Sequence, residues 1–140
     1  MCLLSDRLVR DNGDMSGTLF FDGACGMCTR SRDFVVRIDR TGDLQTQPLQ
    51  SPGAAERLGI SPASLLESVR WLDHPSGAVY SGAEAANAAL SAALGTKLPL
   101  SFYRLPGVRF IEDVVYRWVV AHRYRFPGTT PYCQSYPAAC

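Results

Sequence analysis

The sequence of 140 residues contains no long hydrophobic run. No apolar stretch approaches the roughly 20 residues that a membrane-spanning helix requires. The N-terminus begins with Cys2-Leu3-Leu4 and then turns polar, so it lacks the apolar region of a secretory signal peptide. These absences argue against a membrane partner and predict a cytoplasmic protein.

The chain also lacks an excess of charge of either sign. Its 14 basic side chains nearly balance 13 acidic ones, which leaves a net charge of +1 at pH 7. Such a balance gives no general electrostatic attraction to nucleic acid or anionic lipid, so we expect neither as a partner. The composition, 46% hydrophobic and 19% charged, is that of a soluble globular protein. A length of 140 residues predicts one domain, which is long enough to form a hydrophobic core.

Cysteine is scarce, and its number is odd. The five cysteines are Cys2, Cys25, Cys28, Cys133 and Cys140. In a reducing compartment an odd number indicates catalytic or metal chemistry rather than a framework of structural disulfides.

The feature that most indicates chemistry is the C-x-x-C motif Cys25-Gly26-Met27-Cys28. It follows a short apolar run, residues 18–21, and precedes a segment in which apolar residues recur with helical period. This order predicts that Cys25 lies at the start of a helix, where unpaired N–H groups and the helix dipole favour a thiolate. Cys28 then lies one turn further on, close enough to form a disulfide. The motif therefore indicates dithiol redox chemistry.

The remaining elements follow from periodicity and from turn residues. In chain order we expect a strand at 18–21, a helix at about 25–40, a strand at 44–49, two short helices begun by Ser51-Pro52 and Ser61-Pro62, a hairpin of strands at 69–73 and 78–80, an alanine-rich helix ending near Gly95, a short apolar piece between Pro99 and Pro106, and a longer amphipathic helix.

This order predicts a thioredoxin-like α/β fold. The first crossover is βαβ, which makes its two strands parallel, and the hairpin then adds antiparallel pairing. The result is a mixed sheet with flanking helices and an extra C-terminal helical segment. We expect a disordered leader at 1–16, the domain at 17–133 and an irregular tail at 134–140.

Two helical faces and the tryptophans are expected in the core. The first face belongs to the alanine-rich helix and contains Ala86, Ala89, Leu90, Ala93 and Leu94. The second belongs to the long helix and contains Ile111, Val114, Val115, Trp118, Val119 and His122. Trp71, on the predicted hairpin, is also expected inside, and His122 is interpreted as a packed histidine rather than a base.

The stretch Phe21-Asp22-Gly23-Ala24-Cys25-Gly26-Met27-Cys28 resembles the DCC family of predicted thiol-disulfide oxidoreductases. That family takes its name from an aspartate and two cysteines, which match Asp22, Cys25 and Cys28. Further similar stretches lie at 48–51, 80–85 and 123–128, followed by Cys133, so the resemblance covers roughly residues 18–133. It implies a thioredoxin-like fold and thiol-disulfide exchange.

One departure from ordinary thioredoxins concerns substrate binding. Those proteins place a cis-proline just before the third strand, opposite the C-x-x-C, where it helps to hold the substrate backbone. Here that position falls near Ser68-Val69, and no proline is present. The sequence supports the dithiol but not the usual backbone pairing with substrate.

Within the motif, Cys25 is the predicted nucleophile and Cys28 the thiol that resolves a mixed disulfide. Gly23 and Gly26 are expected to open the loop and keep Cys25 accessible. Two other interpretations stay open: a pair of core cysteines without redox function, and a metal site. A metal would need two further ligands from Cys133, Cys140, His74 and His122, which form no second tight pair.

Asp22 and the C-terminal segment are candidate auxiliaries. Asp22 either exchanges protons with the dithiol and tunes it, or accepts backbone N–H bonds and fixes the loop, and we favour the structural role. If the tail folds back over the first helix, Cys133 becomes a third redox cysteine and Arg123, beside Tyr124, contacts an anion. The alternative is a helix end with dipole-complementing arginines and a structural tail.

The sequence therefore predicts an enzyme that exchanges disulfides without any cofactor beyond its cysteine pair. Its partners would be a disulfide-containing protein or small thiol and an external reductant. The alternative is a non-enzymatic binding or metal-holding module of the same fold.

Overall fold

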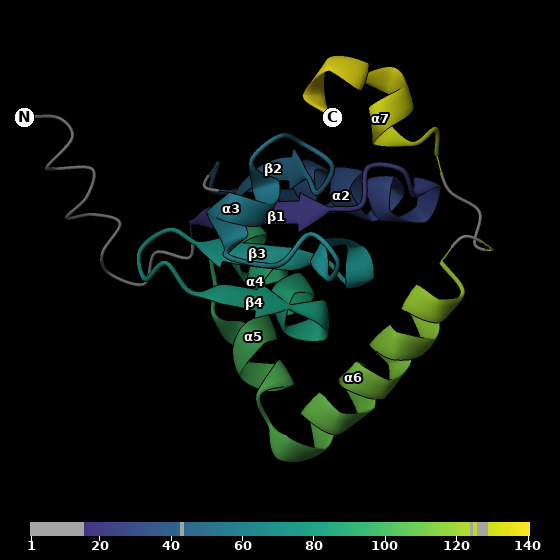
Figure 1. Ribbon diagram of the computed structural model, residues 1–140. Helices are drawn as coiled ribbons and strands as arrows, with labels where there is room; N and C mark the ends of the chain where they lie inside the picture. Colours follow the sequence, from purple (N-terminus) through teal and green to yellow (C-terminus); the bar gives the residue numbers. More distant parts are fainter. Residues whose placement is uncertain (1–15, 43, 124, 126–128) are drawn as a thin grey trace, which may run out of the picture.

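A four-stranded sheet with the order β2-β1-β3-β4 forms the centre of the structure, a computed structural model that describes residues 16–42, 44–123, 125 and 129–140. Strand β1 (Gly17–Phe21) pairs in parallel with β2 (Leu44–Pro48) and antiparallel with β3 (Arg70–Asp73). Strand β4 (Val79–Ser81) completes the predicted hairpin (Figure 1). The thioredoxin-like mixed sheet is confirmed. The predicted leader lies outside the described residues, apart from Ser16.

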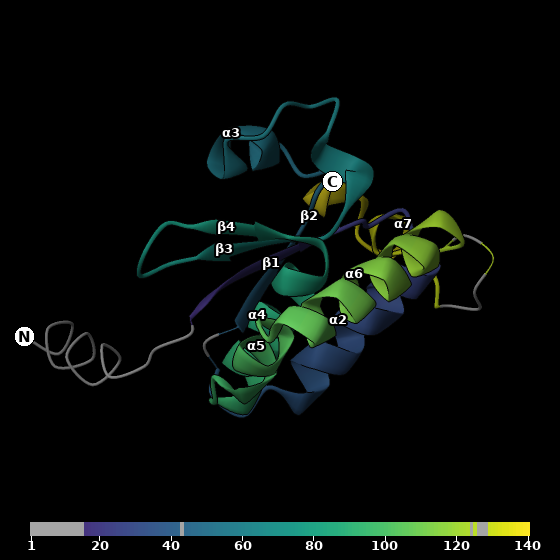
Figure 2. The same cartoon turned by 90° about the horizontal axis from the view of Figure 1, so that it is seen from below.

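Helices cover both faces of this sheet (Figure 2). One face carries α2 (Gly26–Ile38), α4 (Gly82–Leu94), α5 (Leu98–Tyr103) and α6 (Pro106–Ala121), and the other carries the short α3 (Ala54–Leu58). Helix α2 is the crossover between the two parallel strands, so the C-x-x-C lies at the carboxyl end of β1.

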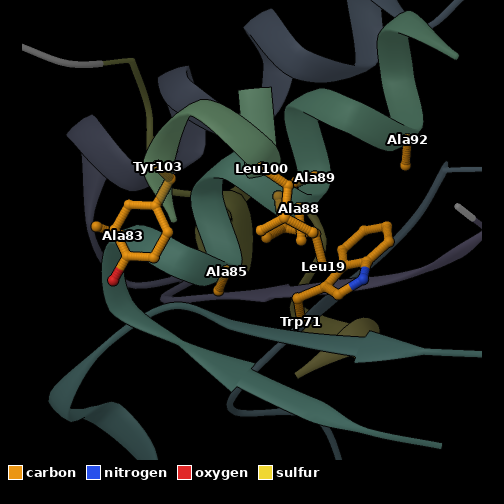
Figure 3. Packing of buried hydrophobic residues seen from close by; sticks show 9 residues of the cluster. All are labelled: Leu19, Trp71, Ala83, Ala85, Ala88, Ala89, Ala92, Leu100 and Tyr103. Carbon is orange, nitrogen blue, oxygen red and sulfur yellow. The ribbon is translucent and has the colours of Figure 1, made fainter. Parts of the chain in front are cut away.

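The main core lies between the sheet and α4. Leu19 and Trp71 point from neighbouring strands toward Ala88 and Ala89 (Figure 3). Small side chains on α4 let its backbone approach the sheet closely enough to enclose the large indole of Trp71, which is 0% exposed. Because strand side chains alternate, Phe20 points to the opposite face and packs under α3 with Leu49, Ala54 and Leu58.

The two short helices begin later than predicted. Helix α3 starts at Ala54 after Gly53, which has φ of 82°, and a 3₁₀ turn occupies Leu65–Glu67. The predicted serine N-caps are wrong because Ser51 is used in a preceding turn: its hydroxyl donates to the Pro48 carbonyl and its own carbonyl accepts from the Ala54 N–H. The prolines in these segments mark turns rather than first helical turns.

On α4 the inward face is shifted from the prediction. Leu94 is 36% exposed, whereas Ala85, Ala88 and Ala92 are buried. A leucine at any of these three positions would hold the helix away from the sheet, so the alanines form the contact.

The largest difference concerns α6, whose predicted core face lies open to solvent. Ile111, Val114, Val115 and Trp118 are each more than half exposed. The helix instead contacts α4 and α5, which leaves its most apolar stripe outward. The prediction that Trp118 and His122 are core residues is wrong: the His122 ring stacks on Trp118 at a centroid distance of 4.7 Å, on the surface.

The chain after residue 128 forms two short helical turns, α7 (Tyr132–Ser135) and a 3₁₀ turn at Pro137–Ala139. They lie beside the start of α2 and the carboxyl end of β1 (Figure 1). Among the described residues, no helix is both long and apolar enough to cross a bilayer.

Candidate active site

Cys25 is the N-cap residue of α2 and lies in a tight turn after β1. Its N–H donates to the Asp22 carbonyl at 3.2 Å, which closes the turn. Its Sγ accepts the Cys28 N–H at 3.2 Å, one of the backbone donors that a helix N-terminus leaves unpaired. The Thr29 hydroxyl and N–H both donate to the Cys25 carbonyl. The backbone therefore holds the Cys25 sulfur where an N–H and the helix dipole favour negative charge.

The two cysteines differ in accessibility, and not in the expected way. Cys25 is 0% exposed, so the prediction that the glycines keep it accessible is wrong. The C-terminal tail lies across the turn: the Tyr132 N–H donates to the Thr29 hydroxyl at 3.1 Å, and the Cys133 N–H donates to the Gly23 carbonyl at 2.9 Å. These two anchors lie on either side of Cys25 in the sequence.

Aromatic contacts fix the tail on the turn. Tyr132 meets the Phe21 ring edge-on at a centroid distance of 5.2 Å, and the Arg32 guanidinium lies 5.3 Å from the Tyr132 ring centroid. Such cation–π and edge contacts contribute about 0.5–1.5 kcal/mol each. The tail is thus packed against the site through both backbone and side chains.

Cys28 is half-buried and faces a groove of about 1040 Å³ between α2, α4 and α6. Most of the groove lining is apolar, and the apolar side chains are Leu19, Phe21, Met27, Phe34, Val35, Val69, Ala86, Ala89, Leu90 and Val119. Asp22 and Arg123 also line the groove, beside Cys28. A ligand in this groove would therefore contact the second cysteine of the motif rather than the first.

The pKa of the Cys28 thiol is raised well above its ordinary value, chiefly because of burial. A hydrogen bond to Cys25 and the negative charges of Cys25 and Asp22 raise it further, while Arg123 lowers it. The raised pKa keeps the Cys28 thiol protonated at neutral pH. That state suits a thiol that reacts second.

Alkylation of the reduced native protein should reveal this raised pKa. We expect the rate of iodoacetamide labelling at Cys28 to keep rising beyond the ordinary thiol pKa of about 8.5, instead of levelling off there. Replacing Asp22 by asparagine removes one negative neighbour, so labelling at a given pH should be faster. The rates can be read by mass spectrometry after digestion. A profile for Cys28 that levels off like that of free cysteine would contradict the assignment.

Asp22 joins the turn to two distant parts of the chain. It is 3% exposed; its Oδ1 accepts the Ala24 N–H at 3.0 Å and the Gln50 side-chain amide at 2.6 Å, and its Oδ2 lies 3.3 Å from Arg123. Gln50 in turn accepts the Gly23 N–H at 2.9 Å. Asp22 thus fixes the loop, and its carboxylate also lies beside the dithiol; its exchange of protons with the dithiol stays a prediction.

The Asp22–Arg123 pair should be strongly coupled energetically. We expect Arg123→Met to lower the free energy of unfolding by about 3 kcal/mol, because it deprives a buried carboxylate of this cation. Adding Asp22→Asn should then cost much less than it does in the wild-type background. Urea unfolding of the four proteins measures the coupling. Arg109→Met is the matched control, since its 4.0 Å pair with Asp113 is exposed and should be worth below about 0.5 kcal/mol. Additive effects at Asp22 and Arg123 would contradict the coupling.

The strand edge that thioredoxins offer to substrate is occupied here. No peptide bond among the described residues is cis. The Val69 N–H is bound by the Tyr116 hydroxyl of α6 at 2.9 Å, and the Val69 carbonyl accepts the Gly82 N–H at 3.0 Å. The Val69 N–H and carbonyl, at the position where thioredoxins place the cis-proline, are therefore both hydrogen-bonded within the chain and are not free to pair with a substrate backbone.

The structure brings together Asp22, Cys25, Cys28, Arg123 and the tail bearing Cys133; Tyr124 lies outside the described residues. Cys133 is bonded to Cys140 in a disulfide. Within the described part of the chain, no group of three or more His, Cys, Asp or Glu side chains is arranged to hold a metal ion. Sequence reasoning missed Gln50 as a site residue, although the stretch at 48–51 was already noted as similar to the family.

Comparisons with known proteins give a family and a relative for this chain. The model of the family described as "DCC1-like thiol-disulfide oxidoreductase" matches residues 19–129. A protein of Bacillus subtilis (strain 168) named "Uncharacterized protein YuxK" is 27% identical over 118 residues, which cover 82% of this chain and 83% of that protein. No solved structure matches the chain significantly.

Proposed function

Because the chain belongs to the DCC1-like thiol-disulfide oxidoreductase family, we propose that it exchanges disulfides through Cys25 as the attacking thiolate and Cys28 as the resolving thiol. The observation that carries this assignment is the hydrogen bond from the Cys28 N–H to the Cys25 Sγ at the N-cap of α2. A sulfur held by a helix N-terminal N–H is stabilised as the thiolate, which is the reactive species.

In the proposed reaction, the Cys25 thiolate attacks one sulfur of a disulfide, and the other sulfur leaves as a thiolate. Cys28 then loses its proton, attacks the Cys25 sulfur of the mixed disulfide and releases the second thiol. Two electrons pass from the dithiol to the substrate, and a Cys25–Cys28 disulfide remains. An external reductant restores the dithiol.

Asp22 and Arg123 are proposed as positioning residues. Asp22 holds the turn through Ala24 and Gln50, and its charge adds to the burial that raises the pKa of Cys28. Arg123 partly offsets that charge. Tyr124 and Cys133 remain proposed auxiliaries within a domain at 17–133.

The apolar groove beside Cys28 supports a disulfide-containing protein or a small thiol as partner. Its lining accommodates apolar side chains of a partner beside Cys28, the thiol proposed to resolve the mixed disulfide. Since Val69 is bonded internally, we propose that substrate binds through this groove rather than by strand pairing.

The test is the reduction of a generic disulfide, such as oxidised glutathione or insulin, by wild type and by Cys25→Ser with the same reductant. Loss of the enzyme-dependent rate in the variant would support the proposal, and equal rates would overturn it.

A binding module is the second candidate, and the exposed apolar stripe of α6 favours it. It predicts no enzyme-dependent reduction by the wild-type protein. Stoichiometric zinc in protein purified without chelator, together with absent activity, would support its metal-holding form.

A further inference from the structure

The Cys133–Cys140 disulfide lies directly against the turn that carries Cys25. The Cys133 N–H is bonded to the Gly23 carbonyl, and a Cβ added to Gly23 would come within 2.5 Å of the Cys133 Sγ. Only a glycine therefore allows this approach. The Gln50 Oε1, which also accepts the Gly23 N–H, lies 4.0 Å from the same sulfur. A second pair of sulfurs thus contacts the active-site turn two residues before Cys25.

Accessibility sets Cys25 apart from the two tail cysteines. Cys25 is fully buried, whereas Cys133 and Cys140 are half-buried. With the tail in place the Cys25 sulfur has no exposed surface, so attack on a disulfide from solution requires the tail to move, whereas the tail disulfide already lies against the turn. The disulfide best placed to react with Cys25 is therefore the chain's own.

We propose that Cys133–Cys140 is a second redox-active pair, which exchanges electrons with Cys25 and Cys28 and passes them to disulfides outside the protein. This inference rests on the proposed function, because it requires Cys25 as a nucleophile. It assigns the tail as a relay rather than as a structural cap.

The exchange balances within the chain. The Cys25 thiolate attacks the Cys133 Sγ, a Cys25–Cys133 bond forms, and Cys140 leaves as a thiolate. Cys28 gives up its proton and attacks Cys25, and Cys133 leaves in turn. The dithiol is oxidised to a Cys25–Cys28 disulfide, and the tail disulfide is reduced to a dithiol. The tail dithiol then reduces an external disulfide by the same two steps.

The first arm of the test measures whether the two sulfurs meet. Cys2 is replaced by serine throughout, and Cys28→Ser with Cys140→Ser leaves Cys25 and Cys133 alone. Trypsin gives fragments 11–30 and 126–140, so a Cys25–Cys133 disulfide joins two otherwise separate peptides. We expect mild oxidation to join them within monomers. The matched control is the same variant oxidised in denaturing urea, where the fold no longer holds Cys133 against the turn and the bond should form at least ten times more slowly. If either serine substitution unfolds the chain, the alanine version replaces it.

The second arm measures turnover. Removing both tail cysteines, with Cys133→Ser and Cys140→Ser, should lower the rate of external disulfide reduction at least tenfold. A rate equal to or above that of wild type would overturn the relay and indicate a cap, as would the absence of the joined peptide. Neither result touches the proposed function, which fails separately if Cys25→Ser keeps the wild-type rate.

Discussion

Replacement of Cys25 by serine is expected to lower enzyme-dependent disulfide reduction by about a hundredfold or more, because a serine hydroxyl does not ionise at neutral pH and cannot replace a thiolate. The variant should fold normally, since serine still accepts the Cys28 N–H and occupies a similar volume in the buried turn. Turnover with a fixed reductant, alongside the unfolding curve, separates lost chemistry from lost structure.

Cys28→Ser provides the contrast that assigns the two roles. It blocks only the second step, so it should halt turnover after a mixed disulfide has formed on Cys25, and that adduct can be seen by mass. Cys28 rather than Cys25 faces the groove, so the experiment must also test whether Cys28 attacks first. An adduct on Cys28 in Cys25→Ser, with none on Cys25 in Cys28→Ser, would make Cys28 the nucleophile.

Replacement of Trp71 by alanine should destabilise the fold by about 3–5 kcal/mol. The indole is fully buried between β3 and the alanine face of α4, and those small side chains cannot move inward to fill the space it leaves (Figure 3). Its Nε1 is buried with no hydrogen-bond partner among the described residues. Because the substitution breaks no hydrogen bond and removes an unsatisfied donor, we expect the loss of unfolding free energy to lie toward the lower end of this range. Denaturant unfolding measures it.

Trp118→Ala is the matched control, since Trp118 is the other tryptophan of the chain and is 57% exposed. Its loss removes the stacking on His122 and should cost below about 1 kcal/mol. Similar losses at the two positions would show that α6 packs on another surface in solution.

Turn chemistry and strand pattern were sufficient to predict the architecture. The apolar run at 18–21, the crossover helix and the hairpin around His74–Gly77 are local signals, and each corresponds to an element in the structure. The N-cap position of Cys25 follows from the same signals, because a helix that starts directly after a strand fixes what stands at its first residue. Helix starts were displaced where Ser51 served a turn instead of a cap.

The faces of the later helices could not be predicted in the same way. Periodicity shows that α6 has an apolar stripe, but not whether another element covers it. On α4 the choice between Leu94 and the alanines depends on how closely the helix approaches Trp71, which is a property of two elements together.

Spacing and local propensity act over a few residues, and they were enough to predict the dithiol, its place at a strand-to-helix junction and the fold. The folded chain was needed to show that Cys25 is buried while Cys28 faces a groove, that Arg123 pairs with Asp22, and that the tail disulfide lies on the active-site turn. Those contacts join residues about 100 positions apart in the chain, and packing, which no local pattern records, sets their distances.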